Sequence, residues 1–180
     1  MKSPLEIRFL KETGCDVELL FKAGRVRVFQ NFLQKIEKAN KLFAKVARPF
    51  IPEEKEVIEL ASSQDYLVSS FLKQRRIPLL GYDSDSFALP EAPLREEENL
   101  SGHFLSNGCY EETGELLAQF LRRGSFTVGV CADKRSSYFK NLKKQYRALY
   151  HQLLRSRKDV AEETKVDGDY RVYMIRGGGR

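Results

Sequence analysis

The chain has 180 residues, with 31 Lys and Arg against 25 Asp and Glu and a formal net charge of +6 at neutral pH. This length is enough for one domain with its own core, and 12 Phe and 8 Tyr give that core bulk, so the composition excludes a disordered protein. We find no apolar signal-peptide region and no apolar run long enough to cross a bilayer, which predicts a soluble cytoplasmic protein without a membrane partner.

The first fifty residues predict a hairpin followed by a long helix. Residues 5–10 and 17–23 are apolar stretches on either side of the turn sequence ETGCD, which predicts an antiparallel N-terminal hairpin. Across residues 26–48 the apolar side chains recur with the period of an amphipathic helix, which Pro49 ends. The outer face of that helix carries Lys35, Lys38, Lys41 and Lys45.

The middle of the chain predicts shorter elements. Residues 56–60 and 77–83 predict strands, and residues 65–76 predict a helix between them. Residues 84–108 hold two prolines and three consecutive glutamates, which predicts a loop or linker.

The acidic segment 84–108 is also the best place for a domain boundary, because its composition differs from that of both flanks. We expect a single domain over residues 1–180. The alternative is a boundary at this segment, between residues 1–83 and 109–180.

The second half of the chain alternates helices with strands. Residues 111–123 and 136–158 predict helices, and residues 125–132 and 170–175 predict strands. Alternation of this kind predicts strands and helices in one layered domain. We therefore expect an α/β or α+β fold, a mixed sheet with the antiparallel N-terminal hairpin and with helices packed on it.

Cysteines and histidines are few and scattered. Cys15, Cys109 and Cys131 form no C-x-x-C pair, which argues against a disulfide framework, and the two histidines lie too far apart to suggest a zinc site. Cys131 lies where a strand meets a helix with cations nearby, so it is either a reactive thiolate or, as the strand alternation favours, an inert buried thiol.

Charge is strongly segregated along the chain. Residues 51–117 contain 5 basic and 14 acidic residues, whereas residues 121–158 contain 11 basic residues and 1 acidic residue. Blocks this uneven indicate a polyanion partner, or an acidic segment that shields the basic one.

The stretch 136–158 carries seven Lys and Arg and no acid. On a helical projection one apolar stripe, which would dock the helix on the sheet, is formed by Tyr138, Leu142, Tyr146, Leu149 and Leu153. Like charges on one helix face repel, so an uninterrupted row suggests a partner with a phosphate backbone, RNA or DNA. The cations on the opposite side are Lys140, Lys144, Arg147, His151, Arg155 and Lys158.

Our first functional hypothesis is a non-catalytic nucleic-acid-binding protein without a cofactor. The basic amphipathic helix 136–158 would hold phosphates, and Tyr150, at the border of the apolar stripe, could stack on a base. The residues expected to bind nucleic acid are Arg122, Arg123, Lys134, Arg135, Lys140, Lys143, Lys144, Arg147, Tyr150, His151, Arg155 and Lys158.

The second hypothesis is a Mg²⁺-dependent nuclease or related phosphoryl-transfer enzyme. Asp83 and Asp85 form an Asp-x-Asp pair at the end of a predicted strand, and Glu59 ends another, so the three carboxylates could share a magnesium ion. This pattern resembles toprim-type phosphoryl-transfer domains, although Leu60 stands where those domains usually have a glycine. Turn-capping by the two aspartates explains them equally well.

The third hypothesis is an interaction or assembly module with a basic face. The acidic residues 91–117 of one copy could meet the basic residues 121–158 of another, giving head-to-tail self-association. The motifs G-x-G-x-x-G, G-x-x-x-x-G-K-[ST], H-E-x-x-H and G-x-S-x-G are all missing, which weakens the usual nucleotide-binding and hydrolase classes.

Overall fold

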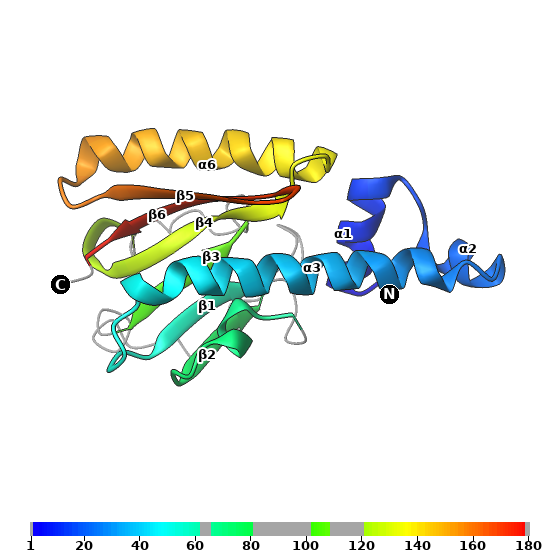
Figure 1. Cartoon of the computed structure of the whole chain (residues 1–180), viewed down its shortest axis with the longest axis horizontal. Helices are drawn as coiled ribbons and strands as arrows, with labels where there is room; N and C mark the ends of the chain where they lie inside the picture. The colour runs from blue at the N-terminus through cyan, green and yellow to red at the C-terminus, as the bar shows by residue number, and fades with distance from the viewer. Residues whose placement is uncertain (1, 62–65, 81–101, 109–120, 179–180) are drawn as a thin grey trace.

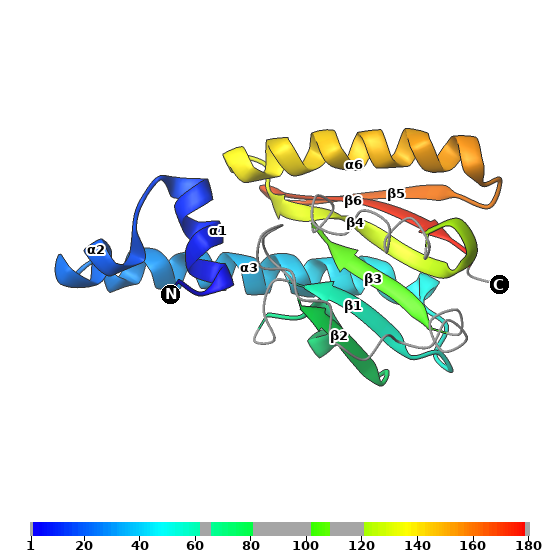
Figure 2. The same cartoon turned by 180° about the vertical axis from the view of Figure 1, so that it is seen from behind.

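The computed structural model describes residues 2–61, 66–80, 102–108 and 121–178, and within them a mixed sheet packs between helices (Figures 1 and 2). The predicted mixed α/β fold class is confirmed. The helical elements are α1 (Pro4–Thr13), α2 (Val17–Lys22), α3 (Val26–Ala47), α6 (Ser137–Ser156) and the short 3₁₀ turns η1 (Arg48–Phe50) and η2 (Val68–Phe71). The strands are β1 (Val57–Ala61), β2 (Arg76–Leu80), β3 (His103–Asn107), β4 (Ser125–Asp133), β5 (Ala161–Asp167) and β6 (Tyr170–Gly177).

The six strands lie in the order β2-β1-β3-β4-β6-β5. The first four in the chain are mutually parallel, whereas β6 runs antiparallel to both β4 and β5. The carboxyl ends of β1 to β4 therefore meet at one edge of the sheet. We call this the carboxyl edge.

The strand β4 is buried on both faces and separates two cores. Its residues Phe126, Val128 and Val130 pack with α6, whereas Cys131 packs with α3, β6 and the start of β1. The helices α3 and α6 therefore lie on opposite faces of the sheet.

The predicted N-terminal hairpin is wrong, because both of its strands are helices. Ser3 and Glu6 form a capping box around α1, and Gly14 ends that helix with φ +70°. Asp16 then caps α2 by accepting a hydrogen bond from the backbone of Glu18. These caps satisfy backbone N–H groups at the starts of α1 and α2, which favours helices there. The apolar residues of both helices pack in a small helical core and not on a sheet.

That small core lies beyond the carboxyl edge. It contains Phe9 of α1, Val17 of α2, and Phe32 and Ile36 of α3, separate from the two cores on the sheet. In both views α1, α2 and the first part of α3 extend past the end of the sheet at which α6 begins (Figures 1 and 2). We call this part of the chain the N-terminal extension.

Several other expectations are met or corrected. The helix expected at 26–48 and the strands expected at 56–60, 125–132 and 170–175 are confirmed within a residue or two. Of the helix predicted at 65–76, the described residues form only the 3₁₀ turn η2, because Leu72 is already extended. The strands β3 and β5 were not predicted.

The antiparallel hairpin of this fold lies at the other end of the chain. The strands β5 and β6 pair around a turn in which Gly168 has φ +57°. Most of β5 is exposed and charged, as suits an edge strand, and that composition hid it in the sequence.

Three predictions fall largely outside the described residues: the strand end 81–83, the helix 111–123 and most of the segment 84–108. The domain boundary stays a prediction, although β1 and β3, from either side of that segment, pair in one sheet. Among the described residues, no helix is both long and apolar enough to cross a membrane.

His103 joins β3 to β4 inside the sheet layer. It is fully buried, and its ring nitrogens hydrogen-bond the hydroxyl groups of Ser125 and Thr127, the latter at 2.7 Å. Burial, together with the charge of Lys55, lowers the pKa of His103 from 6.5 to about 3. The ring is therefore neutral in the folded protein at every pH above that value.

Acid should destabilise the protein through His103. Between pH 6.5 and 3 the His103 imidazole binds a proton in the unfolded chain but not in the folded chain. The free energy of unfolding therefore falls as pH falls, by about 3 kcal/mol at pH 4.5. Urea unfolding across this range should show a flatter pH dependence for His103→Gln than for the wild type. His151→Gln, which changes the only other histidine and lies on the surface, is the control and should keep the wild-type slope. Equal slopes for His103→Gln and the wild type would contradict the assignment.

Candidate functional site

The carboxyl edge is where a sheet of this topology offers space for a ligand. From β1 the chain crosses to β2 on one side and later returns to β3 on the other, so the connections leave β1 and β3 in opposite directions. In open α/β sheets a crevice forms outside the carboxyl ends of the strands at such a switch point. The described residues around β1 and β3 are therefore the first place to look for a site.

Glu59, the middle residue of β1, fixes the position of η2 beside that strand. Its side chain is 1% exposed, and its two carboxylate oxygens accept hydrogen bonds from the backbone nitrogens of Val68 and Ser69, at 2.6 and 2.9 Å. Burial raises the pKa of Glu59, and these hydrogen bonds oppose that rise. The carboxylate thus ties η2 to β1 and sets where the connection between them begins and ends.

A chain of amide side chains links the other elements at the same edge. Asn40 of α3 donates to the carbonyl of Tyr66 at 3.0 Å and accepts from the side chain of Asn107 at 3.0 Å. Asn107, at the end of β3, also accepts from the backbone nitrogen of Cys131 at 2.8 Å. These bonds hold α3, β3, β4 and the residues after β1 in fixed relative positions.

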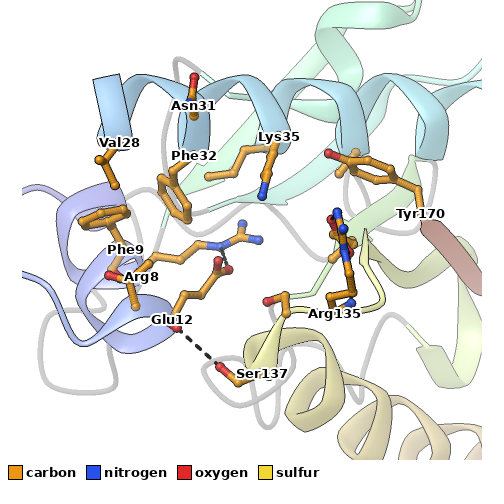
Figure 3. Close-up of a pocket in the computed structure, with 16 residues that line it drawn as sticks. Arg8, Phe9, Glu12, Val28, Asn31, Phe32, Lys35, Arg135, Ser137 and Tyr170 are labelled. Carbon is orange, nitrogen blue, oxygen red and sulfur yellow. Dashed lines mark hydrogen bonds and ion pairs between the residues drawn. The ribbon is translucent and has the colours of Figure 1, made fainter. Parts of the chain in front are cut away.

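A pocket of about 670 Å³ opens beside this framework, between the N-terminal extension and the end of β4 (Figure 3). Phe9, Phe32 and Ile36 form an apolar wall, and Arg8, Lys35 and Arg135 bring three cationic groups toward the space between them. The lining also includes Glu12, Asp133, Ser136, Ser137 and Tyr170.

The two carboxylates in the pocket are already engaged. Arg8 pairs with Glu12 at 3.2 Å, and Arg135 donates to both oxygens of Asp133, at 3.0 and 2.8 Å. The hydrogen bonds from Arg135 lower the pKa of Asp133 to about 2, so this carboxylate is ionised at all ordinary pH values. The acids of the pocket therefore act as partners of arginines.

The predicted magnesium site is not supported. Glu59 points into the protein, and its oxygens are occupied by backbone N–H groups, so it cannot be a metal ligand. Asp83 and Asp85 lie outside the described residues. Within the part of the chain that the structure describes, no three His, Cys, Asp or Glu side chains form a cluster that could hold a metal.

Most residues predicted to bind nucleic acid lie on the surface of α6. Lys140, Lys144, Arg147, His151 and Arg155 are exposed, whereas Phe139, Leu142, Tyr146 and Leu153 are buried against the sheet. Lys158 is exposed just beyond the end of the helix, and Lys134 is exposed just before its beginning.

Four residues of the predicted set are arranged differently. Lys143 lies over the ring of Tyr173, 4.6 Å from its centroid, and Tyr150 is half-buried and stacked on Tyr146. Arg122 and Arg123 precede β4, whose nine residues separate them from the start of α6 and place them at the opposite edge of the sheet. Arg157 donates to the carbonyls of Leu121 and Gly124, so these arginines lie near the last turn of α6.

Cys131 is not a nucleophile. It is 2% exposed, and burial raises the pKa of its thiol to about 12. The thiolate that a nucleophilic mechanism needs is therefore not formed near neutral pH.

One residue of the site can be recognised from the sequence by its place on a helix. Asn40 lies on the apolar face of α3, between Ala39 and the buried residues that follow, and a polar side chain in such a place usually has a specific partner. Arg8, Lys35 and Arg135 carry no such signal, since their convergence depends on the fold.

Comparisons with known proteins found similar solved structures, of which two are described here. No protein-family model matches the chain, and no curated protein matches it. The 16S rRNA methyltransferase RmtF in complex with S-adenosyl-L-homocysteine is 14% identical, with a TM-score of 0.43 over 96% of this chain and 73% of that one. The plantazolicin methyltransferase BpumL, in complex with a substrate analogue and S-adenosyl-L-homocysteine, is 9% identical, with a TM-score of 0.38 over 96% of both chains.

These findings correct the functional hypotheses from the sequence. The two methyltransferases named above were solved with S-adenosyl-L-homocysteine bound, whereas the sequence predicted a non-catalytic nucleic-acid-binding protein and a chain without a cofactor. These two expectations are not retained. The nuclease alternative is not retained either, because Glu59 is buried and both of its oxygens accept backbone hydrogen bonds. The assembly module, for which most of the acidic partner surface lies outside the described residues, is set aside with them.

Proposed function

We propose that the chain is an S-adenosyl-L-methionine-dependent methyltransferase whose methyl acceptor is a nucleic acid. The observation that carries this proposal is the chain's own strand order. Rossmann-like methyltransferases combine a parallel sheet with one reversed strand inserted beside the last parallel strand, as β6 lies between β4 and β5 here. The dinucleotide-binding sheets of dehydrogenases, by contrast, use a different order, 3-2-1-4-5-6.

The sequence after β1 favours this cofactor over a dinucleotide. Residues 62–65, which follow β1, read Ser-Ser-Gln-Asp, without the glycines that let a backbone approach a pyrophosphate. S-Adenosyl-L-methionine has no phosphate, so its binding does not need such a turn.

The hydrogen bonds of Glu59, Asn40 and Asn107 favour a ligand that is bound mainly by the segments following the strands. The polar groups of Glu59, Asn40 and Asn107 are used within the protein, where they position those segments. The hydroxyl group of Ser106, next to Leu60 in the sheet, is buried and has no hydrogen-bond partner among the described residues. When bound, the cofactor would supply the methyl group.

The exposed cations of α6 support a nucleic acid as the acceptor. The helix begins beside the carboxyl edge and carries its row of cations away from it, with no acid among its twenty residues. Phosphates bound along such a row would release condensed counterions, which is the main source of affinity for nucleic acids. The residues proposed for this contact are Lys140, Lys144, Arg147, His151 and Arg155.

The proposal is tested by binding first and transfer second. Titration calorimetry should detect binding of S-adenosyl-L-methionine and S-adenosyl-L-homocysteine, with little heat from NAD or ATP as controls. With tritiated S-adenosyl-L-methionine and a cell extract as acceptor, label should accumulate in RNA or DNA. A Lys144→Glu, Arg147→Glu variant should lose label in nucleic acid while keeping its affinity for the cofactor.

Two results would overturn parts of this proposal. No binding of either sulfur compound would remove the cofactor, and with it the methyltransferase. Label found in protein, with nucleic acid unlabelled, would leave the enzyme but replace the acceptor.

A further inference from the structure

We propose that the pocket between the N-terminal extension and the end of β4 binds a phosphate group of the acceptor strand, through Lys35 together with Arg8 and Arg135. The inference rests on the proposed function for one point, that the bound phosphate belongs to the methyl acceptor. Nothing in the framework around Glu59 assigns a role to this pocket, and none of the three cations belongs to the row on α6.

The charges of the lining leave one cation in excess. Arg8 pairs with Glu12, whereas Arg135 pairs with Asp133 and, at 3.3 Å, with Asp169, which does not line the pocket. Lys35 makes no ion pair with the described residues, yet it is near enough to Asp133 to lower the pKa of that carboxyl group. A ligand that adds one or two negative charges would satisfy this arrangement, whereas a cation would not.

The N-terminus of α6 adds hydrogen-bond donors on the same side. Ser136 caps the helix, and Ser137 is its first residue; both line the pocket. The first backbone N–H groups of a helix have no partner within it, and a helix of twenty residues has a positive end that favours anions. The Ser137 hydroxyl donates to the carbonyl of Glu12, which joins α6 to the N-terminal extension across the pocket floor (Figure 3).

The surroundings favour a strand of nucleic acid over a small free anion. Lys134 lies exposed beside the pocket, and Lys140 lies one turn into α6, so further phosphates would find cations immediately outside. A chain of phosphodiesters could therefore begin in the pocket and follow α6 along its exposed face. A free phosphate would use the pocket alone.

Lys35→Ala tests this placement, and Lys45→Ala is its matched control. Both lysines are exposed on α3, but Lys45 lies about 15 Å further along the helix and does not line the pocket. Binding is measured by fluorescence anisotropy with a short labelled single-stranded oligonucleotide, in RNA and DNA forms, over a series of salt concentrations.

Lys35→Ala should weaken oligonucleotide binding at least about fivefold and reduce the slope of log affinity against log salt by about 0.7, the value for one phosphate contact on a single strand. Lys45→Ala should change affinity less than about twofold. Inorganic phosphate should compete with the oligonucleotide at the wild-type pocket only weakly. Strong competition would mean that the pocket takes a free phosphate instead.

Cofactor titrations separate this inference from the proposed function. Lys35→Ala should bind S-adenosyl-L-methionine as the wild type does. Equal oligonucleotide affinities and slopes for Lys35→Ala and Lys45→Ala would overturn the inference, whatever the cofactor result. Absence of cofactor binding alongside the expected Lys35 effect would overturn the methyltransferase and leave the phosphate pocket standing.

Discussion

Gly129→Ala is expected to destabilise the protein by about 3 kcal/mol or more, although it adds a single methyl group. Gly129 lies in the middle of β4, opposite Met174 of β6 and beneath Phe43 of α3. A Cβ atom at this position would lie 2.2 Å from the carbonyl oxygen of Tyr173 and 2.8 Å from the ring of Phe43. The nearer contact is backbone, so the strand pairing itself has to move.

Thermal unfolding measures this effect. For a chain of this size, about 3 kcal/mol corresponds to a fall in Tm of about 6–12 °C. Gly14→Ala is the control: its φ of +70° carries a cost of about 1–2 kcal/mol, but no atom lies within 4 Å of the added methyl group. If both variants lose the same stability, the close approach of α3 and β6 to β4 is not what requires glycine at 129.

The same close approach shows what periodicity can and cannot predict. The long helices α3 and α6 and the buried strands β1, β4 and β6 repeat their apolar residues often enough to be recognised. The shorter α1 and α2 were mistaken for strands, because ten or six residues contain too few turns for a helical period. Their capping residues Ser3, Glu6 and Asp16 were the better evidence.

Little of the candidate site could be predicted from the sequence. The sequence predicts that Glu59 ends a strand, but the residue lies in the middle of β1, level with Leu105 of β3. Its partners are backbone groups of η2, which no pattern of side chains reveals. The pocket joins Arg8, Lys35 and Arg135 from distant parts of the chain, so only the fold brings them together.

Glu59→Ala is expected to cost about 2–6 kcal/mol, because the backbone N–H groups of Val68 and Ser69 would be left buried without acceptors. Glu59→Gln keeps one acceptor oxygen and should cost about 1–3 kcal/mol. The matched control is Glu56→Gln, which changes a partly exposed carboxylate just before β1 and should cost little.

Activity should respond to Glu59 more sharply than stability does. The Glu59 side chain fixes the position of η2 relative to β1. The proposed function assigns the connection between these two elements to the cofactor, so loss of the side chain would shift both ends of that connection. Glu59→Gln, assayed well below its unfolding temperature, should therefore reduce methyl transfer at least about tenfold, with weaker binding of S-adenosyl-L-homocysteine by calorimetry. A Glu59→Gln protein that is less stable but binds the cofactor normally would show that the carboxylate serves the fold alone. That result would move the cofactor away from the junction of β1 and β3.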